Sequence, residues 1–343
     1  ITGINQAVCV VDTCVDYTHP ALGGCTNNSF INGECNKVIS GWDYGNNDND
    51  PVDVNSHGTH VAGIVASNDS TYRGVAPGAK IVALKVFTNA GSGSTSNAIA
   101  GIDWCISNSS KFNISIITLS LAVTDANGNE IFYSSNCDSA DTSGLARTLS
   151  KGAAFGIFVD ASSGNAGNSS GITSPACGEN VTSVGSVTKS DAISGYNAAS
   201  ILDLLAPGSS ITSTVLNSNF GVKSGTSMAA PHVAGAAAIL MQYWKTSFNI
   251  TLTAREVESK LKISAIQIND TRNSIIFPRI DVLASIQPFL NITTSNLQNN
   301  SYINYNNSLI NITSDVNLTT AVLEWAYANG TNINITMSKA NST

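Results

Sequence analysis

Short apolar runs alternate with segments of helical spacing over residues 1–287, and this alternation constrains the fold more than any other feature. The runs are continuous, as in strands buried on both faces; they are Ala7–Asp12, Ala79–Val86, Ile114–Ser120, Ala154–Val159, Asn180–Val187 and Ser200–Leu205. The helix-like segments are His57–Ala66, Thr95–Ser107, Leu145–Lys151, Gly225–Met241 and one that starts with the capping box Thr253–Glu256. This order predicts a three-layer α/β fold, in which helices cover both faces of a mostly parallel β-sheet.

The character of the sequence changes after Gln287. Residues 288–343 are dominated by Asn, Ile, Thr and Ser and have almost no helical periodicity. The segment from Ala321 to Tyr327 alternates at period two, which is typical of half-buried antiparallel strands. We therefore predict two domains, an α/β domain over 1–287 and a small all-β module over 288–343 that is part of a sandwich.

The charge content excludes some classes of protein. The net charge is −7, only 11% of residues are charged, and no basic run is present, which argues against nucleic-acid binding. No apolar run approaches the roughly 20 residues that span a bilayer. No signal segment precedes Ile1, so we expect that any targeting segment has been removed. We expect a monomer.

Seven cysteines are present, none with metal or redox CxxC spacing. Cys25 and Cys35 bracket a polar loop, and Cys137 and Cys177 lie in polar loops, so we predict these two disulfides. Cys9 lies in an apolar strand and Cys105 on the apolar side of a helix, which predicts buried free thiols. The predicted disulfides favour a secreted or cell-surface protein.

Three residues of complementary chemistry lie at the ends of predicted elements. Asp12 ends a strand, His57 opens a helix, and Ser227 precedes a helix. A serine hydroxyl needs a base, usually a histidine, and a buried carboxylate fixes the tautomer of that histidine. The order Asp, His, Ser is one of the convergent orders of this triad. Gly225-Thr-Ser227 alone is also consistent with a turn whose hydroxyl caps a helix.

The chain resembles the subtilisin-type serine peptidases, or subtilases. The motifs that carry the resemblance are Val11-Asp-Thr13, His57-Gly-Thr-His-Val-Ala-Gly63, Ser163-Gly-Asn165 and Gly225-Thr-Ser-Met-Ala-Ala-Pro-His232. The resemblance implies a secreted endopeptidase that cleaves polypeptides and has its own pro-segment as a partner. It makes Asp12 the orienting acid, His57 the base, Ser227 the acylated nucleophile and Asn165 an oxyanion donor.

Substrate binding follows from the same resemblance. An extended peptide would add as a strand between two edges, Gly91-Ser92-Gly93 and Ser120-Leu121-Ala122. The primary specificity pocket would have as walls Ser162, Ser163 and Gly164, with Thr173 near its base. No acid is among these residues, which predicts an uncharged side chain before the scissile bond.

The loop before His57 is a candidate calcium site. It offers Asp43, Asn46, Asp48 and Asp50, which are oxygen ligands of the kind that Ca²⁺ prefers, and it matches the length of a calcium loop in thermitase-like subtilases. The alternative is a solvated polar turn.

Other positions carry structural or divergent residues. His60 and His232 recur in the family's helices without acting as bases, so we predict structural roles. Cys14 and Ala122 stand where the family usually has Gly, and Asp160 replaces an apolar residue.

Of two rival functions, one remains open and one is excluded. An inactive subtilase-like surface or adhesion module is the alternative, with the Asn/Thr-rich tail as its binding part. A lipase or esterase is excluded, because the chain lacks Gly-X-Ser-X-Gly and the order Ser, Asp, His.

Overall fold

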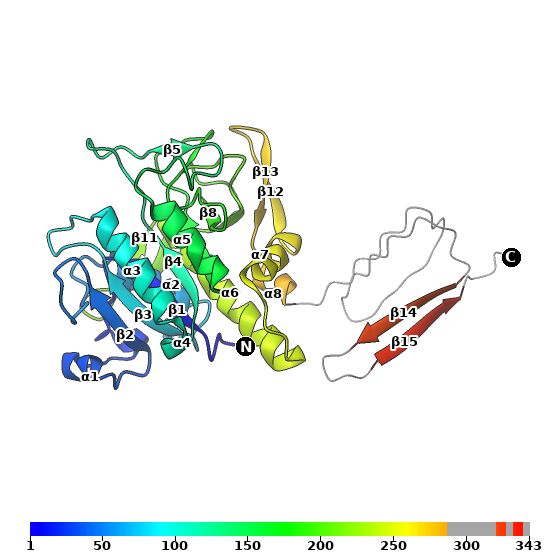
Figure 1. Cartoon of the computed structure of the whole chain (residues 1–343), viewed down its shortest axis with the longest axis horizontal. Coiled ribbons are helices and arrows are strands. Elements are labelled where there is room, and N and C mark those ends of the chain that lie inside the picture. Colours follow the sequence, from blue (N-terminus) through cyan, green and yellow to red (C-terminus); the bar gives the residue numbers. More distant parts are fainter. Residues whose placement is uncertain (287–319, 327–331, 339–343) are drawn as a thin grey trace.

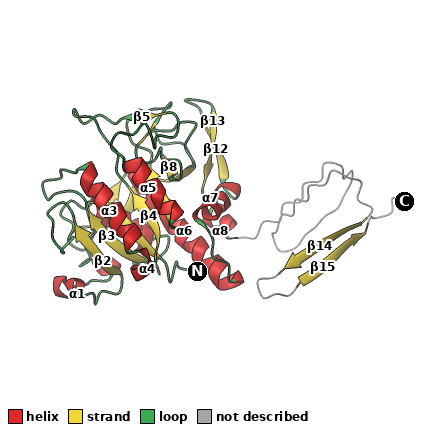
Figure 2. Cartoon of the chain, in the orientation of Figure 1, coloured by secondary structure: helices red, strands yellow, loops and turns green. Residues whose placement is uncertain are grey.

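A computed structural model describes residues 1–286, 320–326 and 332–338. Its centre is a nine-stranded sheet with helices on both faces, which confirms the predicted three-layer α/β fold (Figures 1 and 2). The strands that follow one another across this sheet are β12-β13-β9-β8-β6-β4-β1-β3-β2.

The elements have the following bounds. The strands are β1 Ala7–Asp12, β2 Val38–Asp43, β3 Lys80–Lys85, β4 Ile114–Leu119, β5 Phe132–Tyr133, β6 Phe158–Ser162, β7 Ile172–Thr173, β8 Thr182–Val187, β9 Leu204–Pro207, β10 Ile211–Val215, β11 Asn219–Lys223, β12 Ile266–Asp270, β13 Ile275–Arg279, β14 Thr320–Ala326 and β15 Asn332–Ser338. The helices are η1 Pro20–Leu22, α1 Asn27–Ile31, α2 His57–Ala66, α3 Thr95–Ser107, α4 Ser109–Phe112, α5 Leu145–Ala154, α6 Thr226–Phe248, α7 Ala254–Ile263 and α8 Val282–Ser285.

The sheet is parallel except for its last pair, β12 and β13, which form an antiparallel hairpin. Because β1, β3, β4 and β6 run in one direction, their carboxyl ends meet at a single edge. In open α/β sheets this is the edge where ligands bind. Asp12 ends β1 at this edge.

Alternating side chains of each central strand enter two separate cores, because successive residues of a strand point to opposite faces. Val8 and Val10 of β1 pack with α2 and α6, whereas Cys9 and Val11 pack with α3 and α5. Figure 1 shows α3 and α5 on the near side of the sheet. Burial on both sides explains why these strands are continuous apolar runs.

Three disulfides join the α/β domain. Cys25–Cys35 and Cys137–Cys177 confirm the two predicted pairs. The prediction that Cys9 and Cys105 are free thiols is wrong, since they form the third disulfide, with their Cα atoms 6.3 Å apart. Both lie in the core between the sheet and α3. Their apolar surroundings were predicted, but the packing of α3 against β1 that brings them together was not.

The C-terminal region is described only in part. β14 and β15 form an antiparallel hairpin, with Thr320 opposite Ser338 and Ala326 opposite Asn332. This agrees with the period-two pattern predicted around residues 321–327. The division at residue 287 remains a prediction, because 287–319 lie outside the described residues.

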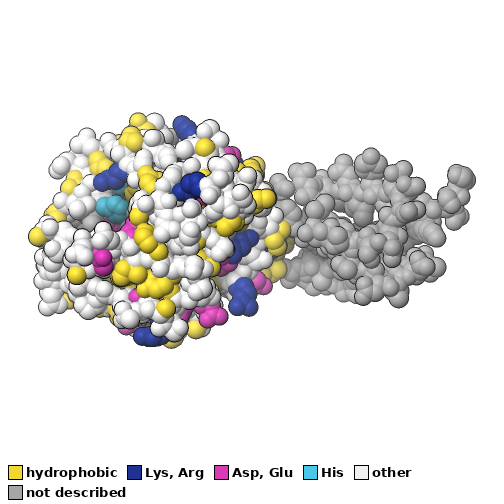
Figure 3. Space-filling view, turned by 90° about the horizontal axis from the view of Figure 1, so that it is seen from above, with side chains coloured by type: hydrophobic (Ala, Val, Ile, Leu, Met, Phe, Trp, Pro, Cys, Tyr) yellow, Lys and Arg dark blue, Asp and Glu magenta, His cyan; other side chains and the backbone are white. Residues whose placement is uncertain are grey.

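The surface carries few charges, as the composition requires. On the face drawn in Figure 3, Lys and Arg side chains are interspersed with Asp and Glu and form no extended basic patch over the described part. In the described residues, no helix is both long enough and apolar enough to cross a membrane.

Candidate active site

Three elements bring Asp12, His57 and Ser227 to one region of the molecule. Asp12 is the last residue of β1, His57 is the first of α2, and Ser227 is the second of α6. The two helices pack on each other on the same face of the sheet. The parallel sheet and its crossovers therefore bring together residues that are far apart in the sequence.

Asp12 and His57 are joined by a short hydrogen bond. Oδ1 of Asp12 lies 2.7 Å from Nδ1 of His57, and the Asp12 side chain is 1% exposed while that of His57 is 27% exposed. An ionised carboxylate only accepts hydrogen bonds, so Nδ1 carries the proton and Nε2 has its lone pair free. This is the tautomer that a general base needs.

The pKa of His57 results from opposing effects. Burial lowers the pKa, because it disfavours the charged ring, but the negative charge of Asp12 and its hydrogen bond raise it. The net shift is upward from the ordinary histidine value.

Asp53 holds the start of α2 against the end of β1, although it belongs to none of the sequence motifs. Its buried carboxylate accepts hydrogen bonds from the backbone N–H and the hydroxyl of Thr59, at 3.0 and 2.6 Å, and from the Thr13 hydroxyl at 3.1 Å. The Thr13 hydroxyl in turn accepts a hydrogen bond from the N–H of Gly58 at 2.9 Å. Asp53 thus links the strand end that carries Asp12 to the helix start that carries His57. An acid just upstream of a helix start was its only signal in the sequence.

Ser227 lies in the first turn of α6. Gly225, before the helix, has φ +153°, and a side chain there would press against Oδ1 of Asn165. The Ser227 hydroxyl donates to the carbonyl of Ser120 at 3.4 Å, and the Ser120 hydroxyl donates to the carbonyl of Ser227 at 2.9 Å. A bond from Ser227 to His57 is not among the hydrogen bonds of the described residues. Catalytic hydrogen bonds of this kind are often long without substrate.

Asn165 is oriented by the start of α6. Its Oδ1 accepts the backbone N–H of Thr226 at 2.9 Å and the Thr226 hydroxyl at 3.1 Å. Because a backbone N–H can only donate, this contact assigns the oxygen of the amide. Nδ2 has no acceptor among the described residues and is a donor at the edge that carries Ser227.

The predicted walls of the specificity pocket lie together. The N–H of Thr173 donates to the carbonyl of Ser163 at 3.1 Å, and a Cβ on Gly164 would lie 2.8 Å from Cγ2 of Thr173. Ser162 ends β6 beside them. These residues are buried.

The two predicted peptide-binding edges follow β3 and β4, the strands on either side of β1. Ser120, Leu121 and Ala122 come directly after β4, and Ser120 is bonded to Ser227. Ala122 is not among the described residues with positive φ, so its methyl group is accommodated without backbone strain. Gly91, Ser92 and Gly93 form an exposed turn after β3, closed by the bond from the Thr88 N–H to the Ser92 carbonyl at 2.8 Å.

An acid borders the predicted pocket, contrary to the expectation from sequence. Glu130 accepts the backbone N–H groups of Asn165 and Ala166, at 2.7 and 3.3 Å, and the Asn197 amide at 2.6 Å. A Cβ on Gly164 would lie 2.6 Å from Oε2 of Glu130. Glu130 belongs to none of the subtilase motifs, so only the folding of its loop could reveal this position.

Two of the predicted calcium ligands have protein partners. Asp43 is buried and paired with the Lys85 ammonium at 2.8 Å, because β2 pairs with β3 in a register that sets these residues opposite each other. Asp50 accepts instead from Tyr17 at 2.5 Å and from Asn27 at 2.7 Å. No group of three or more His, Cys, Asp or Glu side chains in the described part of the chain could hold a metal ion. Two of the four predicted carboxylate and amide ligands are thus engaged by other side chains, and calcium on Asp43, Asn46, Asp48 and Asp50 remains a prediction.

The other two helical histidines make structural contacts. Nε2 of His60 donates to the carbonyls of Ile211 and Gly221, at 3.0 and 3.1 Å, which ties α2 to the β10–β11 hairpin. Burial lowers the pKa of His60 to about 4, so the ring is neutral. His232 lies 2.8 Å from the carbonyl of Met228 through Nδ1, and burial lowers its pKa also.

Cys14 and Asp160 are buried departures from the family pattern. Cys14 has φ +102°, a strained value for a residue with a side chain, and burial raises the pKa of its thiol. Gly58 packs directly on the Cys14 backbone. Asp160 accepts one hydrogen bond, from Thr118 at 2.6 Å, and burial raises its pKa well above the usual value.

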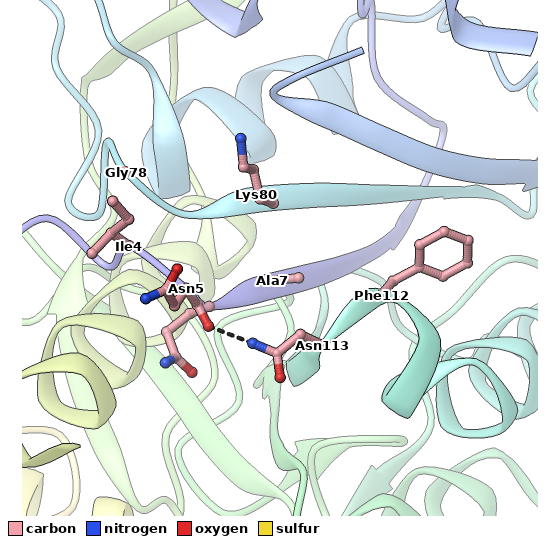
Figure 4. A pocket seen from close by; sticks show the side chains of 8 residues that line it. Ile4, Asn5, Ala7, Gly78, Lys80, Phe112 and Asn113 are labelled. Carbon is pink, nitrogen blue, oxygen red and sulfur yellow. Dashed lines mark hydrogen bonds between the residues drawn. The ribbon is translucent and has the colours of Figure 1, made fainter. Parts of the chain in front are cut away.

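Two surface hollows differ in their relation to these residues. One, of about 410 Å³, is lined by Glu130, Asn165, Ala166 and neighbouring loop residues. The other, of about 390 Å³, lies where β1 begins and includes Ile4, Asn5, Lys80 and Asn113 (Figure 4). There the Asn113 amide donates to the carbonyl of Asn5, and no residue of the predicted site is present. Only the first hollow adjoins the candidate active site.

Comparisons with known proteins agree with this geometry. The chain is 35% identical to a thermophilic serine proteinase of Bacillus sp. (strain AK1) and 36% identical to subtilisin E of Bacillus subtilis (strain 168), over 75% and 79% of its length. It spans 57% and 63% of those two proteins. It is 35% identical to thermitase of Thermoactinomyces vulgaris, over 76% of this chain and 83% of that protein.

A solved structure supports the same relationship. The crystal structure of a cold adapted subtilisin-like serine proteinase matches with a TM-score of 0.64 and 32% identity, covering 81% of this chain and 89% of that one. The family model described as the subtilase family matches residues 3–306. The chain belongs to the subtilase family.

Proposed function

We propose that this chain is a serine endopeptidase that hydrolyses peptide bonds through an acyl-enzyme on Ser227. The observation that carries the proposal is the 2.7 Å bond between the buried Asp12 carboxylate and Nδ1 of His57. This bond leaves Nε2 of His57 as the proton acceptor, on the helix that packs against the start of α6.

In the first half of the reaction, the Ser227 hydroxyl attacks the substrate carbonyl carbon while its proton passes to Nε2 of His57. Asp12 stabilises the imidazolium that results. Nδ2 of Asn165 and the backbone N–H of Ser227, at the positive end of α6, stabilise the oxyanion. His57 then gives its proton to the departing amine. In the second half, water gives a proton to Nε2 of His57 and attacks the acyl carbonyl carbon. The ester bond to Ser227 then breaks as His57 returns the proton to the serine oxygen, which releases the acid product.

The substrates would be polypeptides bound in an extended conformation. The segment Ser120-Leu121-Ala122 presents backbone groups beside Ser227, and Gly91-Ser92-Gly93 offers the opposing edge. Three disulfides favour an extracellular location. Action on the chain's own pro-segment and a monomeric state remain predictions.

Calcium in the loop of residues 43–50 is a separate question. A calcium ion on Asp43 would have to compete with the Lys85 ammonium, which already neutralises that buried carboxylate. We therefore expect that thermal unfolding of the chelator-treated protein gives the same midpoint with and without added Ca²⁺. An increase that is lost in Asp43→Asn would restore the loop as a calcium site.

Hydrolysis of fluorescently labelled casein tests the proposal. The wild-type chain should release fluorescent peptides, and Ser227→Ala should reduce the rate to background while unfolding at the same temperature. A folded wild-type chain without hydrolysis would favour the rival function, an inactive subtilase-like surface module.

A further inference from the structure

Glu130 lies on a surface loop, residues 123–136, that packs against the predicted specificity pocket. At its end, β5 pairs with β7, with Phe132 opposite Thr173. At its start, the N–H of Val123 donates to the carbonyl of Ser174 at 2.9 Å. Because Thr173 was predicted at the base of the pocket, this loop is anchored to the pocket itself.

The carboxylate is held by neutral donors only. Oε1 accepts the N–H of Asn165, and Oε2 accepts the N–H of Ala166 and the amide of Asn197. The Asn197 amide also donates to the carbonyl of Ser163 at 3.1 Å, which connects Glu130 to the pocket wall. These bonds fix the side chain in one position.

The charge of Glu130 is not compensated by a cation. Among the described residues, no Lys, Arg or His forms an ion pair with it. A carboxylate has about four lone-pair positions, and three donors are present, so one position remains for a further donor. A half-buried negative charge with a free acceptor position attracts a cationic ligand more strongly than an exposed one does.

The Glu130 side chain borders space that a substrate can reach. Glu130 and Asn165 line the same open hollow of about 410 Å³. Oε2 of Glu130 and Cγ2 of Thr173 both come within 3 Å of the point where a Gly164 side chain would begin, at 2.6 and 2.8 Å. These contacts place the carboxylate between the buried pocket wall and the hollow, so a long side chain that enters the hollow would end close to it. Lys and Arg have the length and the charge that this position requires.

We propose that Glu130 is a specificity-determining residue that selects substrates with Lys or Arg immediately before the scissile bond. This inference rests on the proposed peptidase function and replaces the expectation of an uncharged side chain there. Glu130 acts on the choice of substrate and takes no part in the proton transfers at Ser227.

The test uses fluorogenic peptides that differ only in the residue before the scissile bond, namely Lys, Arg, Gln or Leu. We expect wild-type kcat/KM to be at least about tenfold higher for Lys and Arg than for Leu. In Glu130→Gln the ratio should fall about tenfold, through loss of the basic substrates, while the Leu peptide changes little. Asp125→Asn, which removes an acid from the same loop, should leave the ratio of kcat/KM values unchanged.

The outcomes separate this inference from the function on which it rests. If the wild-type chain cleaves the Leu peptide as fast as the Lys peptide, the inference alone is overturned. It is also overturned if Glu130→Gln lowers kcat/KM equally for all peptides, which would indicate that Glu130 positions Asn165. Cleavage of none would contradict the peptidase function too. If Glu130→Gln does not fold, inhibition of wild-type by peptide aldehydes ending in Arg or Leu decides, since the inference requires stronger inhibition by Arg.

Discussion

The backbone N–H of Thr226 donates to Oδ1 of Asn165 at 2.9 Å, and this bond determines which end of the amide faces the site. The helix that carries Ser227 therefore also orients the second oxyanion donor. Nucleophile and donor are coupled through two adjacent residues, Thr226 and Ser227. If the start of α6 shifted, both would move together.

Asn165→Ala should lower kcat and leave KM nearly unchanged, because the amide acts on charge that develops in the transition state. We expect a loss of about 10²–10³; subtilisin, a relative of this chain, is the source of that range. Steady-state kinetics on a peptide substrate measures it. Asn127→Ala, at an exposed turn, is the control. A rise in KM with normal kcat would show instead that Asn165 binds substrate.

The acid limb of kcat/KM should lie above the ordinary histidine pKa of about 6.5. His57 must be neutral to accept the serine proton, and Asp12 raises its pKa against the opposing effect of burial. Asp12→Asn should move the limb to lower pH and reduce kcat about 10⁴-fold, as the same change does in a trypsin-type triad. Asp103→Asn, an exposed acid, should do neither. A limb that Asp12→Asn leaves in place would assign it to another group.

Thiol titration should find one free cysteine. Three disulfides use six of the seven cysteines, which leaves Cys14. Because Cys14 is fully buried, we expect no reaction with a thiol reagent in the native protein and one equivalent in denaturant. Three equivalents would mean that one of the three disulfides is reduced, and mapping of the labelled peptides would show whether it is Cys9–Cys105. Cys14→Ala should then give none and serves as the control.

Stability should fall between pH 7 and pH 5 partly through His60. Its pKa is about 4 when folded and about 6.5 when unfolded, so the unfolded chain binds more protons in this interval and stability rises with pH. The contribution to the free energy of unfolding between these two pH values is about 2 kcal/mol. Urea unfolding of wild-type and His60→Gln measures it. An equal pH dependence in both proteins would contradict the assignment.

The sequence was sufficient to predict those features that depend on local pattern or on chemistry at element ends. Buried strands such as Ala7–Asp12 are recognisable as apolar runs, and the capping box Thr253–Glu256 is present as predicted. Asp12, His57 and Ser227 could be proposed as site residues because each stands at the end of such an element. The predicted strand direction then requires that these ends approach one another.

The features that could not be predicted depend on contacts between distant segments. Lys85 opposes Asp43 because of the β2–β3 register, and Cys9 meets Cys105 because α3 packs over β1. Glu130 reaches Asn165 through a loop whose conformation has no repeating pattern. In each case the residue type was visible, but its partner was fixed only by tertiary packing.

The central claim is that Ser227 is a nucleophile activated by His57 and Asp12. Labelling with a fluorophosphonate, followed by mass spectrometry of the digested protein, tests it most directly. We predict one adduct, on Ser227, that is absent in Ser227→Ala and formed far more slowly in His57→Ala, with both variants folded. Wild-type protein that is folded yet unlabelled, or that carries its adduct on another serine, would contradict the account.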